Sequence, residues 1–173
     1  MNLHGIAPTA SSRLRVYQFR HIRKKVYCSK SLSLLQFDCY LVSIFLVKTI
    51  KRSYTIDAPV EKVWQALVDS KEIEGWGGGP AVMDDKVDTE FKLWGGDIHG
   101  KNTHVVKGKR LIQDWYSGDW VEPSNLTIKL KSQGDKTLVD LLHKNVPDDE
   151  AREIDDGWNR YYFGEIKRYL ELK

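Results

Sequence analysis

The stretch Asp149–Leu172, DEAREIDDGWNRYYFGEIKRYLEL, decides the fold of this chain. Its apolar residues recur at steps of three and four, which places them on one side of a helix. Acidic residues crowd the first turn and basic residues the last, as the helix dipole favours. The sequence predicts a long closing helix with a broad aromatic face that must lie against another surface. The stripe consists of Ile154, Trp158, Tyr162, Ile166 and Tyr169, widened by Tyr161, Phe163 and Leu170.

The preceding chain supplies that surface as short strand-like segments. A first strand over 49–56 leads to an amphipathic helix from Val60 to Val68 and to a shorter helix that Gly75 ends. Residues 76–80, WGGGP, are expected to form a loop. Further segments then follow at the spacing of an antiparallel meander. They cover 81–83, 90–94, 98–106, 109–116, 126–131 and 137–145.

These patterns predict an α+β fold, in which a curved antiparallel sheet wraps around the long C-terminal helix. Two short helices after the first strand would close one end. The length of 173 residues fits one domain with an appendage. We expect the domain to comprise 49–173.

Residues 1–48 form a basic leader, with eight basic residues against the single acid Asp38. We interpret it as a disordered or non-native extension. A transit peptide and a membrane-surface tether stay open as alternatives. The uninterrupted apolar run, Cys39–Val47, is too short for a membrane span, which needs about 20 residues.

The domain itself is mildly acidic, because residues 49–173 carry 19 basic residues and 23 acidic ones. This balance argues against a nucleic-acid partner. Both cysteines, Cys28 and Cys39, lie in the leader, so the domain has neither a disulfide framework nor a thiolate metal site. We therefore expect a reducing compartment, the cytoplasm.

Four sequence words in the expected order carry a resemblance to known proteins. They are IDAPVEKVW at 56–64, EFKLWGG at 90–96, RLIQDW at 110–115 and HKNVP at 143–147. The order of elements resembles the helix-grip fold of the SRPBCC superfamily, which includes START-type lipid-transfer domains. The words themselves resemble the branch of activators of the ninety-kilodalton heat-shock protein's ATPase. The resemblance covers roughly residues 49–172.

The resemblance implies a cavity between sheet and helix, which relatives use for lipids, sterols, polyketides or hormones. It also implies a chaperone as a partner and a role in the stress response. The eukaryotic co-chaperone carries a separate N-terminal domain, and nothing in this sequence matches it. One fold can serve many functions, so both implications must be supported by the residues of a binding site.

Candidate ligand-binding residues are the aromatic and apolar side chains that the strand and helix patterns direct toward the cavity. Tyr162 is the preferred one, since its hydroxyl would need a partner if buried. His143 shares a strand face with Val139 and Leu141, although such a histidine more often has a structural role. The full set is Trp76, Phe91, Leu93, Trp115, His143, Trp158 and Tyr162.

No catalytic residue, metal site or cofactor is predicted. The sequence lacks the phosphate-binding, nucleophile-elbow and metalloprotease motifs. His99 and His104 are five residues apart on one expected strand, so they should point to opposite faces. Glu165 beside the aromatic stripe, together with His143, is the one pair that could serve acid–base chemistry.

Three functions follow, and the first leads. The domain is a non-enzymatic binding protein for an apolar small molecule or lipid, or a co-chaperone-like interaction module, or a cyclase or hydrolase that uses the same cavity. An open internal cavity would favour the first. A filled core with an exposed aromatic patch at Trp94 or Trp120 would favour the second. A buried Glu165–His143 pair facing open space would favour the third.

Overall fold

The structure is a computed structural model that describes residues 46–172, with side chains. The prediction for the leader falls on residues outside this range, except for its last three. The strands are β1 (Val47–Ile56), β2 (Glu90–Leu93), β3 (Ile98–Val106), β4 (Arg110–Ser117), β5 (Ser124–Gln133) and β6 (Lys136–Pro147). The helices are α2 (Val60–Val68), α3 (Ser70–Trp76), α4 (Ala151–Gly157) and α5 (Phe163–Glu171).

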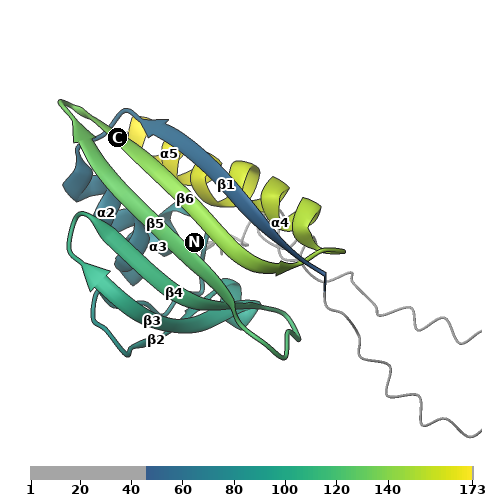
Figure 1. Cartoon of the computed structure of the whole chain (residues 1–173). Coiled ribbons are helices and arrows are strands. Elements are labelled where there is room, and N and C mark those ends of the chain that lie inside the picture. Colours follow the sequence, from purple (N-terminus) through teal and green to yellow (C-terminus); the bar gives the residue numbers. More distant parts are fainter. Residues whose placement is uncertain (1–45, 173) are drawn as a thin grey trace, which may run out of the picture.

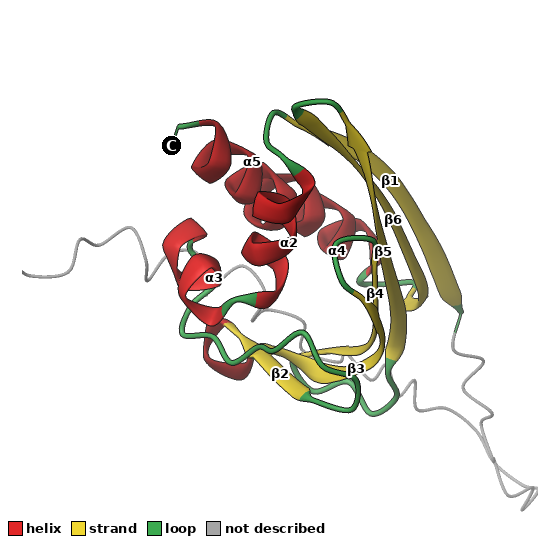
Figure 2. Ribbon diagram, turned by 90° about the vertical axis from the view of Figure 1, so that its left-hand side faces the viewer, coloured by secondary structure: helices red, strands yellow, loops and turns green. Residues whose placement is uncertain are grey.

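One curved antiparallel sheet and one layer of helices make up the domain. The strands follow the order β1-β6-β5-β4-β3-β2, so β1 pairs with the last strand and sits at one edge. The four helices of residues 46–172 lie on the concave side of the sheet, and none of them covers the convex side (Figures 1 and 2). The predicted α+β helix-grip architecture is confirmed.

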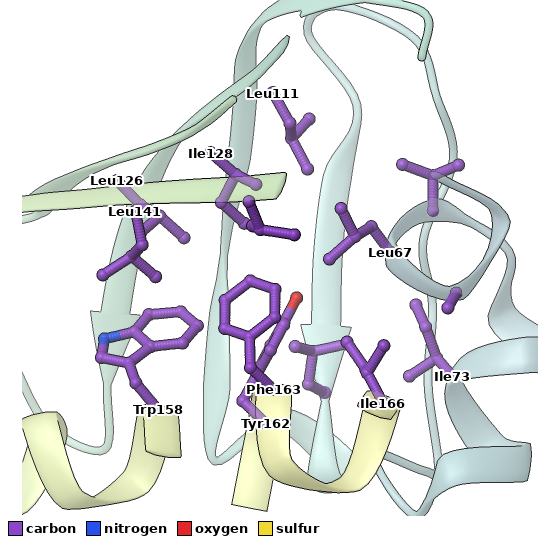
Figure 3. Packing of buried hydrophobic residues seen from close by; sticks show 14 of the residues in the cluster. Leu67, Ile73, Leu111, Leu126, Ile128, Leu141, Trp158, Tyr162, Phe163 and Ile166 are labelled. Atoms are coloured by element: carbon purple, nitrogen blue, oxygen red, sulfur yellow. The ribbon is translucent and has the colours of Figure 1, made fainter. Parts of the chain in front are cut away.

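The alternation of the strands explains which face is buried. Along β4 every second residue is buried, and Leu111, Gln113 and Trp115 point toward the helices. The closing helix sets Trp158, Phe163 and Ile166 against leucine and isoleucine side chains of the central strands (Figure 3). The core therefore lies between the closing helix and the concave face of the sheet.

The closing helix is interrupted by a π-helical turn over Trp158–Tyr162 between α4 and α5. Its signature is the backbone N–H of Phe163, which donates to the carbonyl of Trp158, five residues back. The extra residue rotates the following turn, so that Trp158, Tyr162 and Phe163 are all buried. Tyr161, which the sequence placed in the widened stripe, is only half-buried.

Two predicted details are wrong at α3 and the segment after it. The helix runs past Gly75 to Trp76 and ends at Gly77, whose φ of 100° is left-handed. Gly75 is instead a point of close approach, because a Cβ there would meet the Tyr169 ring. The segment 81–83 makes only an isolated bridge from Val82 to Lys92, so the sheet has six strands and not seven.

A β-bulge in β3 overturns the prediction for the two histidines. The register between β3 and β4 shifts between Asn102 and His104. His99 pairs with Tyr116 and His104 pairs with Ile112, so both histidines lie on the convex face of the sheet. The alternation rule failed here because the bulge inserts one extra residue into the strand.

The π turn makes a prediction at Gly164. A Cβ at this position would collide with the backbone carbonyl of Asn159. Gly164→Ala should therefore destabilise the protein by about 1–3 kcal/mol, although alanine normally favours a helix. Chemical denaturation measures the change. Arg160→Ala, at an exposed position of the same helix, should stay within about 0.5 kcal/mol, and a stabilised Gly164→Ala protein would contradict the π turn.

Candidate functional site

A buried polar network stands at the centre of the candidate site. The fully buried imidazole of His143 accepts a hydrogen bond at Nδ1 from the indole N–H of Trp158, at 3.2 Å. Its Nε2 lies 2.6 Å from the Ser124 hydroxyl, which in turn donates to the Trp115 carbonyl at 2.8 Å. Because Nδ1 accepts, the ring proton is on Nε2 and points to Ser124.

This network holds His143 neutral. Burial lowers the pKa of the imidazole from 6.5 to about 3. Both ring nitrogens are occupied by protein groups, and the rings of Trp115 and Trp158 lie 4.9 and 5.6 Å from the imidazole. A histidine in this state neither accepts a proton near neutral pH nor offers a free nitrogen to a substrate or metal.

A second aromatic group lies further along the closing helix. The ring of Tyr162 is 5.1 Å from Trp76 and 6.2 Å from Trp94. The indole N–H groups of these two tryptophans donate to the carbonyls of Ala66 and Gly77, each at 2.8 Å. The tryptophan side chains thus tie α3 and the loop after it to the core.

Trp158 joins the two groups, since its ring lies 4.7 Å from Tyr162 and 5.4 Å from Trp115. The structure therefore brings five of the seven candidate residues into one chain of ring contacts. Phe91 and Leu93 are also buried, on the concave face of β2, and belong to the same hydrophobic core. Whether these seven side chains contact a ligand stays a prediction.

Two polar atoms in this core lack a protein partner among the described residues. The indole N–H of Trp64 is fully buried and makes no hydrogen bond. None of the hydrogen bonds of the described residues involves the Tyr162 hydroxyl, which lies among apolar side chains (Figure 3). Burial raises the pKa of this hydroxyl well above 10, so it stays protonated. These two groups are the donors that a bound molecule could use.

Sequence reasoning missed Ser124 and did not include Trp94 in the candidate set. Ser124 completes the histidine network, but it begins a strand after a loop and carries no motif of its own. Trp94 was placed at a strand end; it is buried because a three-residue 3₁₀ turn, Trp94–Gly96, folds it back onto Trp76. The indole of Trp120 is half-buried and donates to Glu150 at 2.7 Å.

The acid–base pair considered from the sequence does not form. Glu165 is paired with Arg168, three residues further along the same helix, while His143 is bonded to Ser124 and Trp158. Within residues 46–172, no group of three or more histidine, cysteine, aspartate or glutamate side chains could hold a metal ion. In that same range no helix has the length and apolar character needed to cross a membrane.

The neutral His143 makes stability depend on pH. Since its pKa is about 6.5 in the unfolded chain and about 3 in the fold, its contribution is complete above pH 6.5 and is lost as the pH falls toward 3. The loss should reach about 5 kcal/mol. Urea denaturation at several pH values measures it. The His143→Gln protein should have a lower free energy of unfolding at neutral pH, and this free energy should fall less steeply between pH 6.5 and 3. An unchanged pH dependence in that range would contradict a neutral, buried His143.

Comparison with known proteins places the chain in a family. A family model described as "Activator of Hsp90 ATPase homolog 1-like protein" matches residues 57–171. Among curated proteins, the mouse activator of 90 kDa heat shock protein ATPase homolog 2 is 25% identical over 118 residues, 67% of this chain and 36% of that protein. The human homolog 1 is 24% identical over 122 residues, 69% of this chain and 36% of that protein.

Solved structures agree in fold. An HSP90 activator from Plasmodium falciparum has a TM-score of 0.65 at 24% identity, covering 71% of this chain and 96% of that one. The Aha1 dimer from Colwellia psychrerythraea has a TM-score of 0.63 at 20% identity, covering 72% and 97%. The chain spans about a third of the length of the curated relatives above. It belongs to the family of activator of Hsp90 ATPase homolog 1-like proteins.

Proposed function

We propose that this domain is a non-enzymatic binding protein that acts on a chaperone of the ninety-kilodalton heat-shock class. The family match over residues 57–171 carries the proposal. The packing supports it, because the indole groups of Trp76, Trp94 and Trp158 use their N–H groups inside the protein. These rings belong to the hydrophobic core, so we expect the chaperone to be recognised by the surface of the domain. We expect the protein to act in the cytoplasm, in the response to stress.

The proposal predicts a gain in chaperone turnover. The full-length chain, added to a purified ninety-kilodalton chaperone, should bind it and raise its steady-state ATP hydrolysis several-fold. Calorimetry measures the binding, and a coupled assay measures the hydrolysis. The matched control is the same mixture with an inhibitor of the chaperone's ATP site, which should remove the added hydrolysis. Absence of binding at micromolar concentrations would refute this function.

A second candidate function is the binding of an apolar small molecule or lipid. The Trp64 indole favours it, because its N–H is buried without a hydrogen-bond partner among the described residues, and such a donor costs about 1–3 kcal/mol. The Tyr162 hydroxyl, which belongs to the same core, is the second candidate donor. A ligand with an acceptor oxygen and an apolar body would satisfy one of them and fit among the aromatic rings.

Tyr162→Phe tests this second function. Removing an unpartnered hydroxyl should leave unfolding free energy equal or higher by about 1 kcal/mol, while retention of an oxygen-bearing ligand should fall about tenfold. Native mass spectrometry of protein purified from its own host measures retention. A variant that keeps a co-purified ligand at the wild-type level would contradict the role of Tyr162. Finding no co-purified molecule at all would leave only the chaperone function.

The enzyme reading has the least support. Its acid–base groups would be Glu165 and His143, and these have separate partners, Arg168 for the first and Ser124 and Trp158 for the second. We assign no catalytic residue.

A further inference from the structure

The convex face of the sheet carries an apolar row that the core does not explain. Leu142 on β6, Thr127 on β5 and Ile112 on β4 are consecutive cross-strand partners. Each of these side chains is half-buried. Neither Leu142 nor Ile112 packs against the hydrophobic core, because the core lies on the opposite face of the sheet. Leu138 lies on the same face of β6, four residues from Leu142, with Asp140 between them. No helix of the described domain lies on this side (Figure 2).

Basic side chains border this row. Arg110 and Lys129 are cross-strand partners on one flank, and Lys101 and Lys144 stand on the other. Lys51 pairs with Leu142 and ends the row on the edge strand β1. Lys92 and Lys131 bring the basic residues of this face to seven, against the three acids Glu90, Asp114 and Asp140.

Most of these cations are not neutralised within the domain. Among residues 46–172, the ion pairs involve only Lys101 of the seven, which pairs with Asp88. The guanidinium of Arg110 bonds to His104, a neighbour on the same face. The described domain as a whole nevertheless carries more acids than bases, so the acidic excess lies elsewhere. A basic face on an otherwise acidic domain attracts an acidic partner to this side of the molecule.

We propose that this convex face is a docking surface for an acidic, amphipathic helical segment of a protein partner. The apolar side of such a helix would lie on Leu142, Thr127 and Ile112, and the acids on its two flanks would reach the bordering lysines. The row crosses three strands, about 10 Å, which is the length of about two turns of a helix lying along it. Nucleic acid fits less well, because the row between the cations is aliphatic and offers no ring for base stacking, and the one arginine of this face is bonded to His104.

The partner's identity rests on the proposed function, and the chaperone supplies the segment. The surface itself is tested separately from that function. The chaperone is the first probe. The second is a synthetic helical peptide of about five turns, with leucine on one side and glutamate on both flanks. A single-stranded RNA oligonucleotide is the third.

The test variant is Lys51→Glu/Lys129→Glu/Lys144→Glu, all exposed positions of the convex face. The control, Lys62→Glu/Lys71→Glu/Arg160→Glu, makes the same change of charge at exposed positions on the helical side. The first should weaken binding of chaperone and peptide by at least about tenfold and reduce its salt dependence, and the second should change it less than about twofold. The variant Ile112→Thr/Leu142→Thr should weaken the binding of chaperone and peptide without changing the salt dependence of that binding.

Nuclear magnetic resonance with the peptide locates the contact, through shifts of the amide signals of β4, β5 and β6. Equal loss in the test and control variants would overturn the surface but not the function. Peptide binding at this face without chaperone binding would sustain the surface and refute the proposed function. Tighter binding of RNA than of peptide, or peptide shifts on the helical side only, would overturn the proposal.

Discussion

The fold depends on the contact between the aromatic side of the closing helix and the concave face of the sheet. Trp158, Tyr162 and Phe163 are each nearly inaccessible to solvent. An aromatic side chain buries about 150–250 Å², worth roughly 4–6 kcal/mol at 25 cal/mol per Å² before entropy is deducted. The contact also ties the helix to the edge strand β1, where Tyr54 stacks on Phe163 at 4.6 Å and bonds to Asn159. Losing this contact would expose the aromatic side of the helix, although β1 would still be held by its pairing with β6.

The π turn and the histidine network are two consequences of that contact. A regular helix presents residues four apart, whereas the π turn lets Trp158, Tyr162 and Phe163 reach the same core. The indole of Trp158 then needs an acceptor in an apolar surrounding, and His143 provides it with help from Ser124. A buried network with every member satisfied fixes side-chain positions. It also leaves the imidazole uncharged and engaged, which suits a binding domain more than a catalyst.

The two faces of the sheet have separate roles in this account. The concave face is used for stability. Within residues 46–172, the polar groups that favour a small molecule there are the buried Trp64 indole of α2 and the Tyr162 hydroxyl of the closing helix. The convex face has no cover within the described domain, and it combines a short apolar row with cations. A protein partner would therefore meet the sheet from outside, and a ligand would act through the helix inside. The two functions do not compete for the same side chains.

Periodicity alone determined the α+β class, the order of the elements and the side of the closing helix that is buried, because burial of one face imposes its period on the sequence. It also predicted His143 on the inner face. Only the tertiary structure decided that Trp94 folds back onto Trp76, that Ser124 bonds to His143 and that both His99 and His104 face outward. The β-bulge, the π turn and the end of α3 at Gly77 each change the spacing by a residue or two. The rings that the turns at Trp94 and Trp158 bring into contact come from elements distant in sequence, so local patterns carry no signal for those contacts.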